Sequence, residues 1–123
     1  MGGETIWPNY SFRYFSGKDF KFILNKPQEF ETLTELRPDV IVTILGGNSI
    51  VDFKTNGEVK EEMLEFYDRL NNALPQTIKL AVQVEPRYYA EDNPYHAPTP
   101  QTFQSRRQIL NNFMNKQLKK KVC

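Results

Sequence analysis

A six-residue apolar run, VIVTIL at residues 40–45, constrains the fold of this chain more than any other segment. Most of its residues are β-branched, and such residues favour an extended backbone. An apolar run without polar alternation is typical of a strand that is covered on both faces, as in a parallel sheet. The run ends abruptly at Gly46, Gly47 and Asn48. It therefore predicts a buried strand that stops at a tight turn.

Three segments show the periodicity of amphipathic helices. Pro27 can open one helix, and residues 58–74 carry apolar residues on one helical face, with Asn56 as a candidate N-cap. Thr99 and Pro100 fit the cap and first turn of a last helix. The apolar stripe of that helix comprises Phe103, Ile109, Leu110, Phe113, Met114 and Leu118. We therefore expect three helices, each with one apolar stripe facing a core.

Extended segments alternate with these helices. Residues 11–24 are rich in aromatic side chains and contain two extended-looking runs, and residues 77–84 form a further strand candidate. Strands that alternate with helices favour right-handed βαβ units and a parallel sheet between helical layers. The expected fold is thus α/β, a three-layer sandwich with a mostly parallel sheet.

Composition limits the kinds of partner. The 123 residues suit one domain, spanning residues 1–123, and the net charge of +1 gives no reason to expect nucleic acid. No apolar run is long enough to cross a membrane, and the N-terminus does not resemble a signal peptide. The single cysteine, Cys123, excludes an intrachain disulfide. We expect a cytoplasmic protein without a membrane partner.

Ligands of open α/β sheets bind at the carboxyl ends of the strands, which directs attention to the turn after residue 45. Gly46 and Gly47 permit a tight turn, and the Asn48 amide can donate two hydrogen bonds. Such donors could stabilise an oxyanion or cradle a phosphate, although no phosphate-binding glycine motif is present. The same composition also suits a turn that only closes a strand.

Two further residues follow the candidate strand at 77–84. His96 could transfer a proton near neutral pH, or be an ordinary loop histidine. Arg87 could bind an anionic group of a substrate, or pair with Glu85 or Glu91. One histidine and one cysteine, without paired ligand spacing, argue against a metal site, and no cofactor is expected.

The stretch RPDVIVTILGGNSI resembles the third conserved block of the SGNH, or GDSL-type, esterase and acylhydrolase superfamily, and the resemblance covers roughly residues 10–120. It implies a flavodoxin-like SGNH hydrolase fold and a small ester as substrate. It also implies that Asn48 and the backbone of Gly17 donate to the oxyanion, with Gly46, Gly47 and Ser49 beside them. Ser49 stands where the family usually has Asp.

Larger departures concern catalysis. No Gly-Asp-Ser motif supplies the family's nucleophile, and His96 follows Asp92 by four residues rather than three. The chain thus resembles the central portion of such a domain, without its first and last blocks. A domain truncated in this way has an unpaired sheet edge, through which we expect self-association.

Three hypotheses follow for the function. The chain is either an SGNH-type ester hydrolase by descent, weak or inactive without its nucleophile and base, or a non-catalytic interaction module on the same scaffold. A nucleotide-binding domain that uses the Gly46-Gly47 turn is the third. For the second hypothesis, a lysine cluster near the C-terminus offers either a docking patch or a solvated helix end; it comprises Lys116, Lys119, Lys120 and Lys121.

Overall fold

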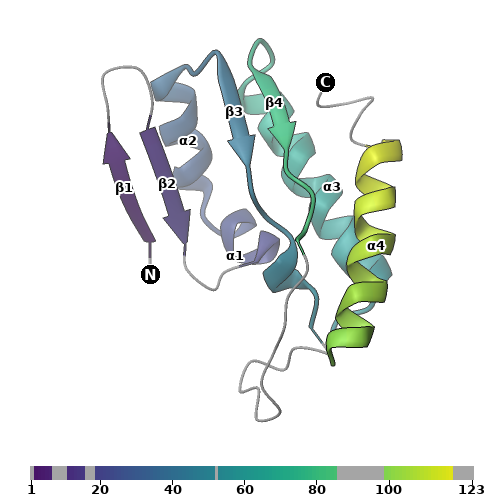
Figure 1. The fold of residues 1–123 in the computed structure, drawn as a ribbon. Helices are drawn as coiled ribbons and strands as arrows, with labels where there is room; N and C mark the ends of the chain where they lie inside the picture. The colour runs from purple at the N-terminus through teal and green to yellow at the C-terminus, as the bar shows by residue number, and fades with distance from the viewer. Residues whose placement is uncertain (1, 7–10, 16–18, 52, 86–98, 118–123) are drawn as a thin grey trace.

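The computed structural model describes residues 2–6, 11–15, 19–51, 53–85 and 99–117. Figure 1 shows two small sheets with helices behind and beside them. Along the chain the elements are β1 (Gly2–Ile6), β2 (Ser11–Phe15), α1 (Phe20–Leu24), α2 (Pro27–Leu36), β3 (Val40–Thr43), the 3₁₀ turn η1 (Gly47–Ser49), α3 (Asn56–Ala73), β4 (Ile78–Ala81) and α4 (Pro100–Gln117). The α/β class expected from the sequence is therefore confirmed.

The parallel pairing expected from the sequence occurs between β3 and β4. Val40 lies opposite Ile78, and Val42 lies opposite Leu80. The helix α3 provides the connection between these strands, as a βαβ unit requires. The hairpin of β1 and β2 is antiparallel and forms a separate sheet, at the left in Figure 1. Among the described residues, the parallel part of the fold is thus one strand pair.

Capping residues set the helix starts close to the predicted positions. Thr55, not Asn56, caps α3, because its side chain accepts from the Glu58 amide while the Glu58 carboxylate accepts from the Thr55 amide. Thr99 accepts from the Thr102 amide and starts α4 as predicted. Pro27 is the first residue of α2, also as predicted.

Of the two extended runs predicted within residues 11–24, the first is strand β2, as predicted, but the second was wrong because it forms helix α1. Asp19 accepts a hydrogen bond from the Phe22 amide and caps α1. One helical turn then places Phe20, Ile23 and Leu24 together in the core. A strand would have sent alternate side chains to opposite faces, so tertiary burial decided against the strand propensity of these residues.

The core lies between β3–β4 and the helices. The stripe of α3 predicted from the sequence is buried throughout, and Tyr67 meets Phe20 and Phe66 at ring-centroid distances of 6.2 and 5.0 Å. In α4, Phe103, Leu110 and Met114 are buried as predicted. Two further members of the predicted α4 stripe differ, since Ile109 is exposed and Phe113 only half-buried. The last member, Leu118, lies outside the described residues.

Helices cover only one face of the β3–β4 sheet in the described part of the chain. On the covered face, Thr43 shares a 2.6 Å hydrogen bond with Tyr67, and Lys79 donates to the Leu74 carbonyl at the end of α3. On the opposite face, Val42 is 56% exposed. The expected strand with two covered faces is thus covered on one face, and no second helical layer is described.

Candidate functional site

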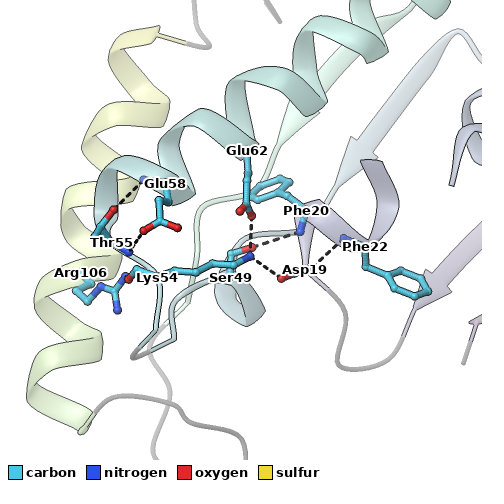
Figure 2. Close-up of polar contacts among 9 residues, drawn as sticks. All are labelled: Asp19, Phe20, Phe22, Ser49, Lys54, Thr55, Glu58, Glu62 and Arg106. Atoms are coloured by element: carbon cyan, nitrogen blue, oxygen red, sulfur yellow. Dashed lines mark hydrogen bonds and ion pairs between the residues drawn. The ribbon is translucent and has the colours of Figure 1, made fainter. Parts of the chain in front are cut away.

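The polar groups nearest to the predicted site gather where β3 ends. Figure 2 shows η1, the start of α1 and the start of α3 meeting there, with Ser49, Asp19 and Lys54 close together. The chain leaves β3 through Gly46 and enters α3 after Thr55. This is the carboxyl end of a parallel strand, the location at which α/β folds place ligands.

Gly46 has a structural requirement for glycine. Its φ of +117° lies where side chains are rarely tolerated, and a Cβ there would approach Val84 Cγ2 to 3.0 Å and Leu110 Cδ2 to 3.4 Å. The backbone therefore turns sharply while packing against β4's continuation and α4. Gly47 is also buried. These contacts alone account for Gly46 at this position.

Ser49 is fully buried, and its hydroxyl accepts a 3.3 Å hydrogen bond from the Phe20 amide. That amide is in the first turn of α1, where no carbonyl of the helix can pair with it. Ser49 therefore joins η1 to α1 inside the core. Its hydroxyl is closed to solvent, so it lies out of reach of a substrate in this conformation.

The structure brings together four of the predicted site residues. Asn48 is half-buried in η1, between the buried residues Gly47 and Ser49 and two residues beyond Gly46. The other three predicted site residues, Gly17, Arg87 and His96, lie outside the described residues.

Lys54 is the centre of a charged cluster beside η1. Its Nζ lies 2.8 Å from Asp19 Oδ2 and 2.8 Å from Glu62 Oε1, and its side chain is 9% exposed. The cluster joins the α1 cap, the segment before α3 and the second turn of α3. A lysine held by two carboxylates neutralises a pair of acids that would otherwise repel each other.

The pKa values in this cluster are shifted toward the charged forms. Burial raises the pKa of Asp19, but the hydrogen bonds from Lys54 and the Phe22 amide outweigh it and leave the pKa below 3.8. Burial lowers the pKa of Lys54, but Asp19 and Glu62 outweigh it and leave the pKa above 10.5. Lys54 therefore stays protonated near neutral pH, which suits an ion pair and not a general base.

Arg106 of α4 binds the segment between η1 and α3 from the side opposite to Asp19. Its guanidinium donates to the Val51 carbonyl at 2.7 Å, to the Lys54 carbonyl at 2.6 Å and to Asn56 Oδ1 at 2.7 Å. The planar fork of arginine suits three acceptors that approach from one side. The segment between η1 and α3 is consequently held between α1 and α4.

Sequence reasoning missed most of these polar partners. Asp19 is a residue type that commonly caps helices, and it directly precedes the apolar residues of α1. The aromatic residues around it favoured a strand instead, so the cap was not predicted. Lys54 is 35 positions from Asp19, and Arg106 is 50 positions from Asn56. No local spacing could have predicted pairs so far apart in the chain.

Hollows in the described part of the chain offer little room beside the candidate site. One, between α3 and α4 beside Arg106 and Ile109, has no room for a water molecule. The other has a volume of about 350 Å³, is shallow and lies between α2 and α3 at Phe30 and Arg69. In the same part of the chain, no group of three His, Cys, Asp or Glu residues could hold a metal ion, and no helix is long and apolar enough to cross a membrane.

Comparisons with known proteins add no assignment: no family model, no curated protein and no solved structure matches this chain.

Proposed function

We propose that this chain is a non-catalytic interaction module on an α/β scaffold, and that the uncovered face of β3–β4 is its binding surface. The observation that carries this proposal is the exposure of six aliphatic side chains on one sheet face: Val40, Val42, Ile44, Ile78, Leu80 and Val82. Parallel strands are normally covered on both faces, so an open apolar face is a place for another element to bind. We call these six residues the aliphatic face.

The polar residues around η1 support a structural role for the candidate catalytic region. Ser49 accepts from the Phe20 amide of α1 inside the core, and Lys54 and Arg106 bind groups of the chain itself. Each of these side chains is committed to holding two or more elements together. Catalysis needs groups directed at a substrate, which these three residues are not.

Binding of a hydrophobic fluorescent dye tests the proposal. At a chain concentration of about 1 µM, which disfavours self-association, we expect the dye anilinonaphthalene sulfonate to bind the folded chain. Val42→Glu should lower its fluorescence at least about fivefold by placing a charge in the aliphatic face. Ile109→Glu is the matched control, because Ile109 is 41% exposed on α4 and lies outside that face. Equal dye fluorescence of both variants and the wild type would contradict the proposal.

An SGNH-type ester hydrolase is the second candidate. It is favoured by Asn48, which is half-buried just after the positive-φ Gly46 at the carboxyl end of a parallel strand, where an oxyanion donor would be needed. In that case the fold would be a three-layer sandwich, completed by a helical layer on the aliphatic face. The substrate would be a small ester.

Hydrolysis of short p-nitrophenyl esters separates the two candidates. For the interaction module we expect no turnover above that of Asn48→Ala, and no labelling by a fluorophosphonate probe. Turnover that falls at least tenfold in Asn48→Ala would instead support a working oxyanion hole, since losing one donor costs about 10²–10³ in rate.

A further inference from the structure

The aliphatic face is regular in both composition and geometry. Val42 lies opposite Leu80 in the parallel register, and Val40 opposite Ile78. The Val82 amide donates to the Thr43 carbonyl at 2.9 Å, which continues the ladder and keeps Ile44 and Val82 on the same side. The face therefore has two rows of three side chains, without a charged or hydrogen-bonding group among them.

The charged and polar residues of the two strands lie on the other face. Lys79, next to Ile78 and Leu80, is buried and donates to the Leu74 carbonyl, while Thr43 is buried against Tyr67. Because successive side chains of a strand point to opposite faces, the inward direction of Lys79 turns Ile78 and Leu80 outward. The exposure of the aliphatic face thus follows from the register itself.

The size of the face suits a small dimer interface. Its exposed fractions range from 37% at Val82 to 77% at Ile44, which corresponds to roughly 600 Å² of surface in total. That is the upper end of what a monomer leaves exposed. Two such faces packed together would remove at most roughly 1,200 Å² from water, which is of the order of the roughly 1,000 Å² expected of a specific interface.

Resting on the proposed interaction role, we propose that the partner of the aliphatic face is a second copy of this chain, joined face to face about a two-fold axis near Val42 and Leu80. Two identical faces without charges bury no unpaired polar side chain when they meet. Aligned packing of two sheets, about 10 Å apart, lets aliphatic side chains interdigitate. The net charge of +1 leaves little repulsion between copies.

Sedimentation velocity over roughly 1 µM to 1 mM protein tests this inference. We expect the mass to rise from 14.4 kDa to twice that value, and Val42→Glu or Leu80→Glu to raise the dissociation constant at least about tenfold. Ile109→Glu, with a similar substitution on α4, should stay within about twofold of wild type. Circular dichroism shows whether each variant is folded. If a glutamate variant does not fold, Val42→Thr is measured in its place.

Two results would overturn the second-copy inference. The first is a wild-type chain that remains a monomer at all concentrations. The second is a dimer that persists equally in folded Val42→Glu or Val42→Thr and in Ile109→Glu, which would place the contact elsewhere, for example at an unpaired strand edge.

Dye binding separates these failures from failure of the interaction role. A monomer whose dye signal depends on Val42 keeps an open binding face for another partner, such as an amphipathic helix, whereas a monomer without that dependence removes both proposals.

Discussion

At the scale of single residues, Gly46 shows how a position that resembles a catalytic motif can be explained by packing. Its backbone has φ of +117°, and a methyl group there would press on Val84 at 3.0 Å. Both effects oppose any side chain, since the conformation itself is strained for L-residues and the core has no spare volume. A glycine is required here whether or not the turn ever binds a ligand.

We therefore predict that Gly46→Ala lowers the free energy of unfolding by about 2–4 kcal/mol. Gly57→Ala is the control, because Gly57 is in α3, its added Cβ would meet nothing closer than 3.8 Å, and alanine favours helix by up to about 1 kcal/mol. Urea unfolding measures both variants. A Gly46→Ala chain as stable as Gly57→Ala would show that the turn at residue 46 relaxes freely.

At the scale of elements, two side chains of α4 hold structures that belong to other parts of the chain. Arg106 binds the segment before α3, and Asn111 pairs with both backbone groups of Val84, accepting from its amide at 2.7 Å and donating to its carbonyl at 3.0 Å. The Asn111 side-chain amide thus makes the two backbone hydrogen bonds at Val84 that an adjacent strand would otherwise make. Through these contacts, α4 fixes the chain at the carboxyl ends of both β3 and β4.

We predict that Arg106→Leu destabilises the fold by roughly 2–4 kcal/mol, because it removes three hydrogen bonds from a charged donor. Arg106→Lys should recover only part of this loss, since an ammonium cannot reproduce the planar fork. Thermal unfolding measures the stability, and trypsin cleavage after Lys54 reports whether the segment has loosened. Wild-type stability and unchanged cleavage in Arg106→Leu would mean that this segment holds its position without α4.

At the scale of the whole molecule, buried ionisable groups give the folded state a range of pH over which it is most stable. Burial raises the pKa of Tyr67 to about 12, despite its hydrogen bond with Thr43, while the unfolded chain keeps a value near 10.0. The unfolded state therefore loses this proton first as pH rises. Asp19 has the opposite effect, since its pKa is lowered in the folded state and the unfolded state gains a proton first as pH falls.

We predict that stability is highest between about pH 4 and 10. It should fall from pH 10 toward 12 by up to about 1.4 kcal/mol per pH unit from Tyr67, and Lys54 adds to this loss because its pKa is raised. Below about pH 4 the contribution of Asp19 is lost. Urea unfolding across pH measures these slopes. Tyr67→Phe should make the alkaline slope shallower, and an unchanged slope would show that Tyr67 is not its source.

Much of the fold was predictable, because the signals that specify it are local. The apolar run before Gly46 predicted β3, the periodic stripe ending at Leu74 predicted α3, and Thr99 with Pro100 predicted the start of α4. The aromatic segment after Gly17 misled the prediction, since side chains such as Phe20 favour strand locally but are buried here by helix α1.

The candidate site was predictable only in part, for a related reason. Gly46 to Ser49 were recognised as a turn at the end of a strand, and the structure places them there. That Ser49 is buried against α1 depends on contacts with residues 29 positions away. Hydrogen bonds across such separations leave no periodic trace in a sequence.

By itself, then, the sequence determined β3, β4 and the helices α2, α3 and α4, because caps, prolines and apolar periodicity act over a few residues. It also determined that β3 is apolar on both faces. Only the tertiary structure decided which of those faces is covered, because that depends on where α3 and α4 come to lie. The register that turns Lys79 inward and Val42 outward left an aliphatic face open, and this face carries the proposed function.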